Sequence, residues 1–453
     1  MRSICLILFC LIISLGLSGN DTIRCEVWLN SEFPRMIKVV QHVDESCAEK
    51  YYYFTNTIPG TYEVMHYGDF IEGIRFIDAE GNRITAKRID KEKYEISNPD
   101  ILRRIEYYVN DSWDELKIKR NYQVFCSRTN FEKDTVYVLN NHAVFGYFKP
   151  DLDKPVVINV HKNSMLYPST VMYKKHVTNS QDLLVAESYH NLFDSPVLYC
   201  IPDTVSFYHN GKKIITSCYI NSELISAEYL QEHIVKPTIK AVSAHYNNFI
   251  PEEYWFIYYL FNEKDNVMSK YFSMAGDALE HKGCSFYVME ADYYSYLDTI
   301  VFDYDQIWIA VHELLHKIFP LTIRSNLVDN MSYYYDQMSR HLWLYEGVTE
   351  YLSIKTRFRE GLITEEKFLE EMKYNIRETE KTKSDPLAVI SENVLKKKYA
   401  EQYDLVYTKG ALLAFLLDIE LFTKSGGEYS IDHLIADLKD ESWHSSFPED
   451  TSR

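Results

Sequence analysis

Residues 311–317 read VHELLHK, in which two histidines four residues apart flank a glutamate. In a helix, His312 and His316 lie one turn apart on the same face, so both imidazoles can reach one point. Zinc binds imidazole nitrogens, and a glutamate beside a metal-bound water can take its proton as a general base. We therefore predict His312 and His316 as zinc ligands and Glu313 as the base. The alternative is an ordinary apolar helix, in which these polar groups would be costly to bury without partners.

The motif can arise by chance and needs a third ligand, which the segment HLWLYEGVTEYLS (341–353) supplies in Glu346. Glu346 and Glu350 are one turn apart on one side of this expected helix. We predict that Glu346 binds zinc and that Glu350 holds the outer nitrogen of a liganding histidine, which would fix that ring's orientation. The alternative for Glu350 is a solvated surface carboxylate. The apolar side of this helix is expected to consist of Leu342, Tyr345, Thr349 and Leu352.

The elements that must position these residues are helices, because apolar residues recur at helical spacing beyond Asp303. We expect helices over about 305–319, 337–359, 364–377 and 405–423. Asp305 is the expected N-cap of the first, and Pro320 is expected to end it. The runs YWFIYYLF and CSFYVME are typical of buried strands, so this half of the chain should be mainly helical with a small sheet.

The preceding part of the chain is expected to be a β-sandwich-like domain, giving an α+β protein. Runs such as IKVVQHV, VYVLNNHAVFGYF and KPVVINVHK are rich in β-branched and aromatic residues, and Pro-Gly and Asn-Gly turns separate them. We assign residues 20–235 to this domain and 236–440 to the catalytic domain. Residues 1–19 are expected to be a signal peptide and 441–453 a polar tail.

The composition restricts the partners and the compartment. The formal net charge is −18, and no basic tract offsets it, which argues against nucleic acid or an anionic membrane as partner. The start MRSICLILFCLIISLGLSG resembles a secretory signal, with an uncleaved anchor as the alternative, so we expect a secreted, periplasmic or other extracytoplasmic protein without a membrane partner once the signal is removed. The mature chain would keep an even number of cysteines, enough for up to three disulfides of undetermined pairing. These are Cys25, Cys47, Cys126, Cys200, Cys218 and Cys284.

HELLH followed by the glutamate of WLYEGVTEY resembles the glycyl aminopeptidase family of gluzincin zinc metallopeptidases. Three further stretches are similar to this family in the right order, and the resemblance spans roughly residues 30–435. They are PGTYEVMHYGDFIEGIRFIDAEGNRI, DALEHKGCS and YTKGALLAFLLDIEL. The resemblance implies a thermolysin-like catalytic domain that binds one Zn²⁺ per chain and acts on peptides or proteins.

The same resemblance implies roles for three more residues. Glu280 would pair with the free α-amine of the substrate, and Tyr407 would donate to the oxyanion of the tetrahedral intermediate. An ordinary salt bridge for Glu280 and a core position for Tyr407 are the alternatives. His281 would either contact the substrate or make a structural hydrogen bond.

Two departures from the family pattern concern the wall of the substrate site. The residues KIFP after His316 lack the Trp-Asn that is common in the family, and Ala278 stands where a glycine is usual.

The implied function is an aminopeptidase that removes small N-terminal residues such as Gly or Ala, with attack by a zinc-bound hydroxide. The alternatives are an endopeptidase or narrowly restricted peptidase on the same zinc chemistry, and a non-catalytic zinc-containing binding protein.

Overall fold

The computed structural model describes residues 22–30, 32–33, 35–44, 49–113, 125–220, 225–261, 276–290, 299–381, 383–440 and 447. The expected signal peptide, Cys47 and all but one residue of the expected tail lie outside these ranges. The chain forms two compact units, each described by itself below. The first unit contains the described residues up to Asn56 and the segment Met65–Pro202. The second contains the loop Thr57–Val64 and the described residues from Asp203 onward.

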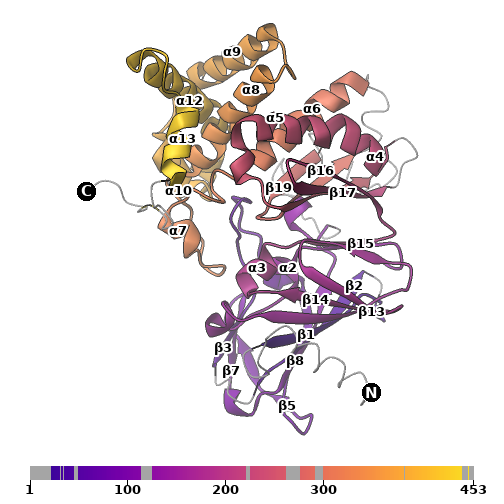
Figure 1. Ribbon diagram of the computed structural model, residues 1–453. Coiled ribbons are helices and arrows are strands. Elements are labelled where there is room, and N and C mark those ends of the chain that lie inside the picture. Colours follow the sequence, from indigo (N-terminus) through magenta and orange to yellow (C-terminus); the bar gives the residue numbers. More distant parts are fainter. Residues whose placement is uncertain are drawn as a thin grey trace. The chain divides into compact units, whose positions relative to one another are not determined.

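The first unit is rich in strands, as expected, and they form three sheets (Figure 1). The eight-stranded sheet has the order β13-β14-β11-β1-β2-β8-β4-β5, the four-stranded sheet β12-β15-β10-β9, and the three-stranded sheet β3-β7-β6. The strands of the first sheet are β1 Ile23–Trp28, β2 Met36–His42, β4 Ile71–Ile77, β5 Arg83–Ile84, β8 Arg104–Asn110, β11 Val156–His161, β13 Tyr173–Thr178 and β14 Gln181–Ala186. The others are β3 Tyr51–Tyr53, β6 Ala86–Arg88, β7 Lys93–Ile96, β9 Asn130–Glu132, β10 Val136–Leu139, β12 Tyr167–Ser169 and β15 Val197–Cys200.

The described helical segments of this unit have three to five residues each. They are η1 Tyr67–Phe70, η2 Pro99–Ile101, η3 Phe125–Ser127, α2 Asn141–Val144, η4 Lys149–Asp151 and α3 Tyr189–Phe193. Strand β1 shows why the sheet forms, since Ile23, Cys25 and Val27 are buried and alternate with less buried residues. It pairs parallel with β11 and antiparallel with β2.

The second unit contains a five-stranded sheet of order β16-β17-β18-β20-β19, in which β19 lies at an edge. Its strands are β16 Asp203–His209, β17 Lys212–Ile220, β18 Glu253–Phe261, β19 Gly276–Glu280 and β20 Cys284–Glu290. Strand β18 pairs parallel with β17 and β20, and all its residues but the first are buried, as is typical of a central parallel strand. Because β16 and β17 pair into this sheet, residues from Asp203 group with the second unit, whereas the sequence placed the boundary at 235/236.

The rest of the second unit is mainly helical, in agreement with the expected fold class. Its segments before the metal motif are α4 Ala227–Leu230, η5 Gln231–Val235, α5 Lys236–Tyr246 and η6 Asn247–Phe249. The later ones are α6 Thr299–Leu315, α7 Asn326–Asp329, η7 Leu344–Val348, α8 Thr349–Arg359, α9 Glu365–Lys381, α10 Leu387–Asn393, α11 Lys397–Ala400, α12 Asp404–Lys424 and α13 Ile431–Asp440. None of the helices in the described ranges combines the length and apolar character needed to cross a membrane.

Helix α6, which carries the HELLH motif, begins earlier than predicted. It starts at Thr299, so Asp305 lies inside the helix and the N-cap prediction is wrong. The residues TIVFDY (299–304) that precede Asp305 contain no helix breaker, and the chain continues the helix through them. The regular helix ends at Leu315, before Pro320.

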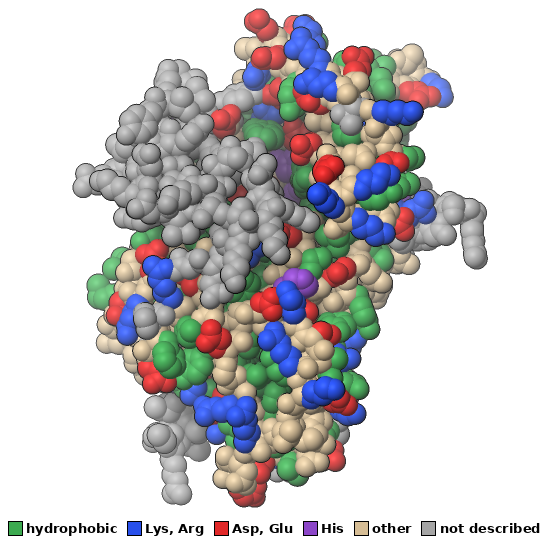
Figure 2. Space-filling view, turned by 180° about the vertical axis from the view of Figure 1, so that it is seen from behind, with side chains coloured by type: hydrophobic (Ala, Val, Ile, Leu, Met, Phe, Trp, Pro, Cys, Tyr) green, Lys and Arg blue, Asp and Glu red, His purple; other side chains and the backbone are tan. Residues whose placement is uncertain are grey.

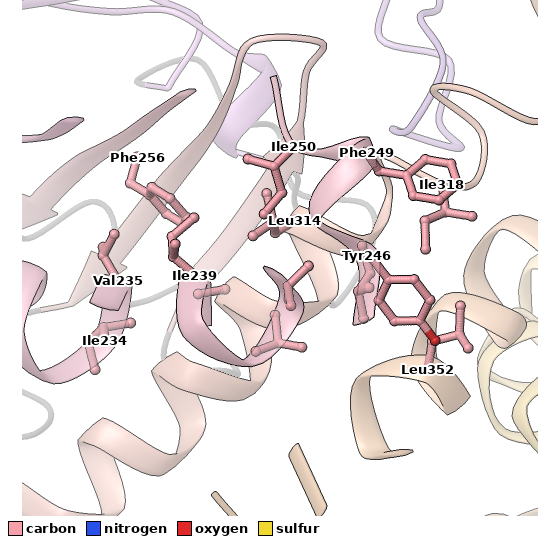
Figure 3. Packing of buried hydrophobic residues seen from close by; sticks show 14 of the residues in the cluster. Ile234, Val235, Ile239, Tyr246, Phe249, Ile250, Phe256, Leu314, Ile318 and Leu352 are labelled. Carbon is pink, nitrogen blue, oxygen red and sulfur yellow. The ribbon is translucent and has the colours of Figure 1, made fainter. Parts of the chain in front are cut away.

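A large apolar core joins helices α5 and α6 to the sheet (Figure 3). Ile239 of α5, Phe256 of β18 and Leu314 of α6 belong to this cluster and are buried. On α8 and the turn before it, Leu342, Tyr345, Thr349 and Leu352 are buried, as their spacing predicted. Because α6 and α8 share this core, the two segments that carry the predicted ligands are held against each other.

The cysteines that the structure describes do not pair with one another, so the expected framework of three disulfides is not formed among them. Among the residues that the structure describes, five of the six expected cysteines are buried, and no disulfide joins any two of them. They are Cys25, Cys126, Cys200, Cys218 and Cys284.

Candidate active site

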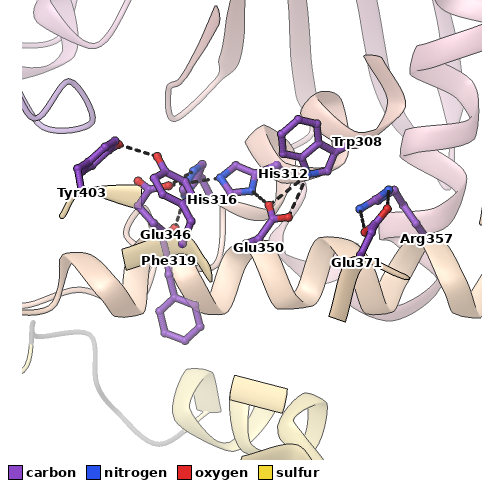
Figure 4. A network of polar contacts seen from close by, with 10 residues as sticks. Trp308, His312, His316, Phe319, Glu346, Glu350, Arg357, Glu371 and Tyr403 are labelled. Atoms are coloured by element: carbon purple, nitrogen blue, oxygen red, sulfur yellow. Dashed lines mark hydrogen bonds and ion pairs between the residues drawn. The ribbon is translucent and has the colours of Figure 1, made fainter. Parts of the chain in front are cut away.

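His312 lies in the last turn of α6 and His316 directly follows that helix, and both side chains are buried (Figure 4). Their ring centroids are 4.7 Å apart. The outer nitrogen of each ring is held by an acceptor: His312 Nδ1 donates to Glu350 Oε2 at 3.0 Å, and His316 Nδ1 donates to the backbone oxygen of Phe319 at 2.8 Å. In a neutral imidazole these hydrogen bonds leave the lone pair on Nε2.

Both Nε2 atoms face the same oxygen. Glu346 Oε2 lies 3.3 Å from His312 Nε2 and 3.6 Å from His316 Nε2. Two nitrogen lone pairs and a carboxylate oxygen at these distances repel one another unless a cation or extra protons lie between them. Ligand bonds of about 2.0–2.2 Å with tetrahedral angles place neighbouring ligand atoms about 3.3–3.6 Å apart, which matches both distances. The donor set therefore fits a zinc ion.

Glu313 also has a carboxylate oxygen near the two histidines, since one ligand atom from each of the three residues lies within 4.8 Å of the others. We assign the third ligand to Glu346 rather than to Glu313, because Glu346 Oε2 faces both Nε2 atoms directly. Glu313 is buried, and its Oε2 has no hydrogen-bond partner among the described residues. Burial raises the pKa of Glu313 to about 7, although His316 and His312 oppose this change. A carboxyl with such a pKa, placed beside the ligands, suits a general base.

Glu346 lies in η7, a π-helical turn at the entrance to α8. Such turns are rare in proteins overall but are common at functional sites. The extra residue in the turn changes the direction in which a side chain points. Burial opposes its ionisation, but His316 and His312 lower the pKa of Glu346 to about 2. Glu346 is therefore a carboxylate at neutral pH, as a metal ligand must be.

Glu350 occupies the position that the sequence predicted, one turn after Glu346 and against His312. Trp308 Nε1 donates to both of its oxygens, at 3.2 and 3.1 Å (Figure 4). Burial opposes a charge on Glu350, yet its hydrogen bond with His312 lowers its pKa. Burial likewise opposes a charge on His312, while Glu346 and Glu350 raise the pKa of His312 well above its usual range. The solvated alternative for Glu350 is thus wrong.

Helix α12 brings Tyr407 to the histidines through a close crossing with η7. A Cβ atom built on Gly347 would lie 2.4 Å from Gly410 Cα and 2.5 Å from the backbone oxygen of Val406. The two backbones can approach this closely only because both residues at the crossing are glycine. Tyr407, one turn before Gly410, has its ring 6.0 Å from that of His312, and its hydroxyl is 2.7 Å from that of Tyr403.

Glu280 is the last residue of the edge strand β19, and its side chain is only partly exposed. Burial raises the pKa of Glu280, while His316 lowers it and Glu346 raises it further, so this carboxyl lies within electrostatic reach of His316 and Glu346. His281 is buried in the turn between β19 and β20, and its backbone N–H donates to Cys284 O at 2.8 Å. The structure thus places Glu280 beside the site, and the role of His281 stays a prediction.

Two contributors to the site were not predicted from the sequence. One is Trp308, which lies one turn before His312 on α6. The other is Tyr62, whose hydroxyl donates to Glu346 Oε1. Trp308 has helical spacing to the motif and could have been found by that signal. Tyr62 lies 284 residues from its partner, and no local pattern connects the two.

Two protein-family models match this chain. Residues 26–201 match the family model described as the peptidase M61 N-terminal domain, and residues 305–413 match that of the M61 glycyl aminopeptidase. Together the two ranges cover more than half of the chain. A search of curated protein sequences gave no match.

Among solved structures, the chain is similar to an aminopeptidase N family protein from Idiomarina loihiensis, with a TM-score of 0.78 and 17% identity over 94% of this chain and 71% of that one. It is also similar to an M1 zinc metallopeptidase from Deinococcus radiodurans that was crystallised with a Tyr-Ser-Ala substrate, with a TM-score of 0.53 and 12% identity over 95% and 88% of the two chains. At these identities the two structures support the fold alone.

Proposed function

Because the chain belongs to the M61 glycyl aminopeptidase family and is a zinc-dependent peptidase, we propose that it removes small residues such as Gly or Ala from the free N-termini of peptides. The observation that carries this proposal is the placement of Glu280. Its partly buried carboxyl lies against the backbone of Gly60, two residues before Tyr62, whose hydroxyl donates to Glu346 Oε1, so a carboxylate on a separate element lies near the predicted ligands. A negative group in this place can bind the α-ammonium of a substrate whose first peptide bond lies at the metal.

Other residues of the site would bind the metal, transfer the proton and stabilise the oxyanion. His312, His316 and Glu346 would hold zinc, which when bound polarises the peptide carbonyl and lowers the pKa of a coordinated water. Glu313, whose Oε2 has no partner in the described structure, would take the proton of the attacking water and pass it to the leaving amine. Tyr407 would donate a hydrogen bond to the developing oxyanion.

The exopeptidase part of this proposal is tested with free and N-acetylated alanine arylamides. A charge-assisted hydrogen bond is worth about 1.5–3 kcal/mol, so acetylation should lower kcat/KM of the wild type at least ten- to a hundredfold. Glu280→Ala should hydrolyse the free substrate poorly and lose most of this preference. Glu366→Ala, which removes an exposed glutamate of α9, is the matched control and should behave like the wild type.

Equal cleavage of free and acetylated substrates by the wild type would refute the exopeptidase reading. It would favour the endopeptidase alternative on the same zinc chemistry.

We further infer export from the cell, because the leader MRSICLILFCLIISLGLSG has the basic start and apolar run of a secretory signal. Mature protein recovered from the producing cell should begin after this leader, as N-terminal sequencing would show. Recovery of the intact leader from the cytoplasm would contradict the proposal.

A further inference from the structure

The loop Thr57–Val64 belongs to the second unit, although the chain on either side of it belongs to the first. Its shape is fixed by two internal hydrogen bonds: Thr57 Oγ1 donates to Glu63 O at 3.0 Å, and Thr61 Oγ1 donates to Ile58 O at 3.1 Å. Gly60 has a φ of 86° and Tyr62 a φ of 50°. The left-handed backbone at Tyr62 is uncommon for a residue with a side chain, and such conformations gather at functional sites.

This loop contacts two carboxylates of the site, those of Glu280 and Glu346. A Cβ atom built on Gly60 would lie 3.2 Å from each carboxylate oxygen of Glu280, so the backbone of the loop passes directly over that side chain. Two residues later, the Tyr62 hydroxyl donates to Glu346 Oε1. The Tyr62 ring packs on Tyr403, with 5.8 Å between ring centroids, and is held in the apolar cluster that also contains Tyr407.

The hydrogen bond of Tyr62 completes a pattern among the predicted ligands. His312 Nδ1 is held by Glu350, and His316 Nδ1 is held by the backbone oxygen of Phe319. Glu346 offers Oε2 to the two Nε2 atoms, which leaves Oε1 as its outer atom, and this is the atom that Tyr62 binds. We propose that Tyr62 is a positioning residue that orients Glu346 for metal binding, an inference that rests on the proposed zinc site.

The chemistry of the contact explains why a tyrosine suits this place. A hydroxyl donor on Oε1 would keep that oxygen from turning toward a bound metal, so Glu346 would offer one oxygen rather than two. Residues that hold metal ligands in this way typically change metal affinity or activity 10–100-fold when they are removed. A tyrosine hydroxyl is protonated at neutral pH, so Tyr62 can donate to Glu346 Oε1.

The test is the zinc affinity of the metal-free full-length protein, measured by competition with a chelating dye. Tyr62→Phe keeps the ring and its contact with Tyr403 but removes the donor, and we expect zinc to bind about 10–100-fold more weakly. Tyr407→Phe removes a hydroxyl that has no hydrogen bond with a predicted ligand, so its zinc affinity should equal that of the wild type. The thermal unfolding midpoint of both metal-free variants should stay near that of the wild type, which separates loss of the donor from loss of the fold.

The outcomes separate this inference from the proposed function. If Tyr62→Phe binds zinc as tightly as the wild type, the positioning role is overturned and the zinc site stands. Equal losses of affinity in Tyr62→Phe and Tyr407→Phe would also overturn it, because the effect would then come from the apolar cluster that both rings share. If the wild type takes up no zinc, the proposed function falls and the role of Tyr62 falls with it.

Discussion

Replacing Gly347 with alanine should lower both the stability and the activity, although the same substitution usually stabilises a helix. Alanine is about 0.8–1.0 kcal/mol more favourable than glycine in a helix interior. At Gly347, however, the new Cβ would lie 2.4 Å from Gly410 Cα and 2.5 Å from Val406 O. Ordinary contacts between carbon atoms are about 3.5–4.0 Å, so η7 and α12 would have to separate by about 1 Å.

The cost follows from the fact that the atoms in contact belong to two backbones. A side chain could rotate away, but Gly410 Cα and Val406 O move only with their helix. Overpacking a buried site typically costs about 1–3 kcal/mol, and the gain in helix propensity offsets part of this, which leaves a net loss of up to about 2 kcal/mol. Glu346 precedes Gly347 directly and Tyr407 lies one turn before Gly410, so a shift of about 1 Å changes their mutual geometry. A misplacement of this size can lower kcat/KM about 100-fold.

Urea unfolding and steady-state kinetics on an alanine arylamide measure the two effects. Gly146→Ala is the matched control, because its Cβ would lie 2.5 Å from the buried ring of Tyr52 in the first unit. This control should lose a similar amount of stability, while the folded enzyme should keep its kcat/KM. A Gly347→Ala variant that is more stable than the wild type and equally active would refute the reasoning.

Three further predictions concern single side chains. Glu350→Gln should weaken zinc binding or activity about 10–100-fold, because the amide holds His312 Nδ1 less firmly than the carboxylate does; an unchanged dye-competition curve and unchanged kinetics would contradict this. Tyr407→Phe should lower kcat about 10²–10³-fold with its zinc content unchanged, and a rate near that of the wild type would remove Tyr407 from the chemistry. Glu26, which accepts hydrogen bonds from His161 and His42, has its pKa lowered to about 2 by them. A carboxyl whose pKa is lowered in the folded state stabilises the protein at pH values above its usual pKa. At pH 7 the free energy of unfolding of the wild type, measured with urea, should therefore exceed that of Glu26→Gln by on the order of 1 kcal/mol, after allowance for solvent screening. This difference should shrink as the pH falls from about 4.5 toward 2, and a difference that is constant over this range would be the wrong result.

The metal-binding motif could be predicted from the sequence because the geometry of a helix determines how residues four positions apart lie relative to each other. Spacings of four residues place His312 with His316 and Glu346 with Glu350, and the structure holds these pairs at the end of α6 with the turn that follows it and on η7 with α8. The residues predicted to form the apolar side are buried, but burial on α8 is not confined to that side, since Tyr351, Ile354 and Arg357 are buried as well. The start of α6 was missed by six residues, since propensity does not distinguish an N-cap aspartate from one inside a helix.

The contacts between segments far apart in the chain could not be predicted from the sequence. Tyr62 reaches Glu346 through a turn with left-handed backbone, and no periodicity connects that turn to a helix far along the chain. The sequence Pro-Gly-Thr-Tyr indicates a turn but not what the turn touches. Likewise, the glycines after Glu346 and Lys409 have a physical reason, the crossing of η7 and α12, only once the two helices are seen together.

The central claim is that zinc is held by His312, His316 and Glu346 while Glu313 performs proton transfer. The most direct measurement is the zinc content and turnover of a single Glu313→Gln preparation beside the wild type. We expect about one zinc per chain in both proteins, with kcat of the variant lower by about 10²–10⁴-fold, because an amide cannot accept the proton of the attacking water. Wild type that is active without zinc, or a Glu313→Gln variant that hydrolyses substrate at nearly the wild-type rate, would contradict the account.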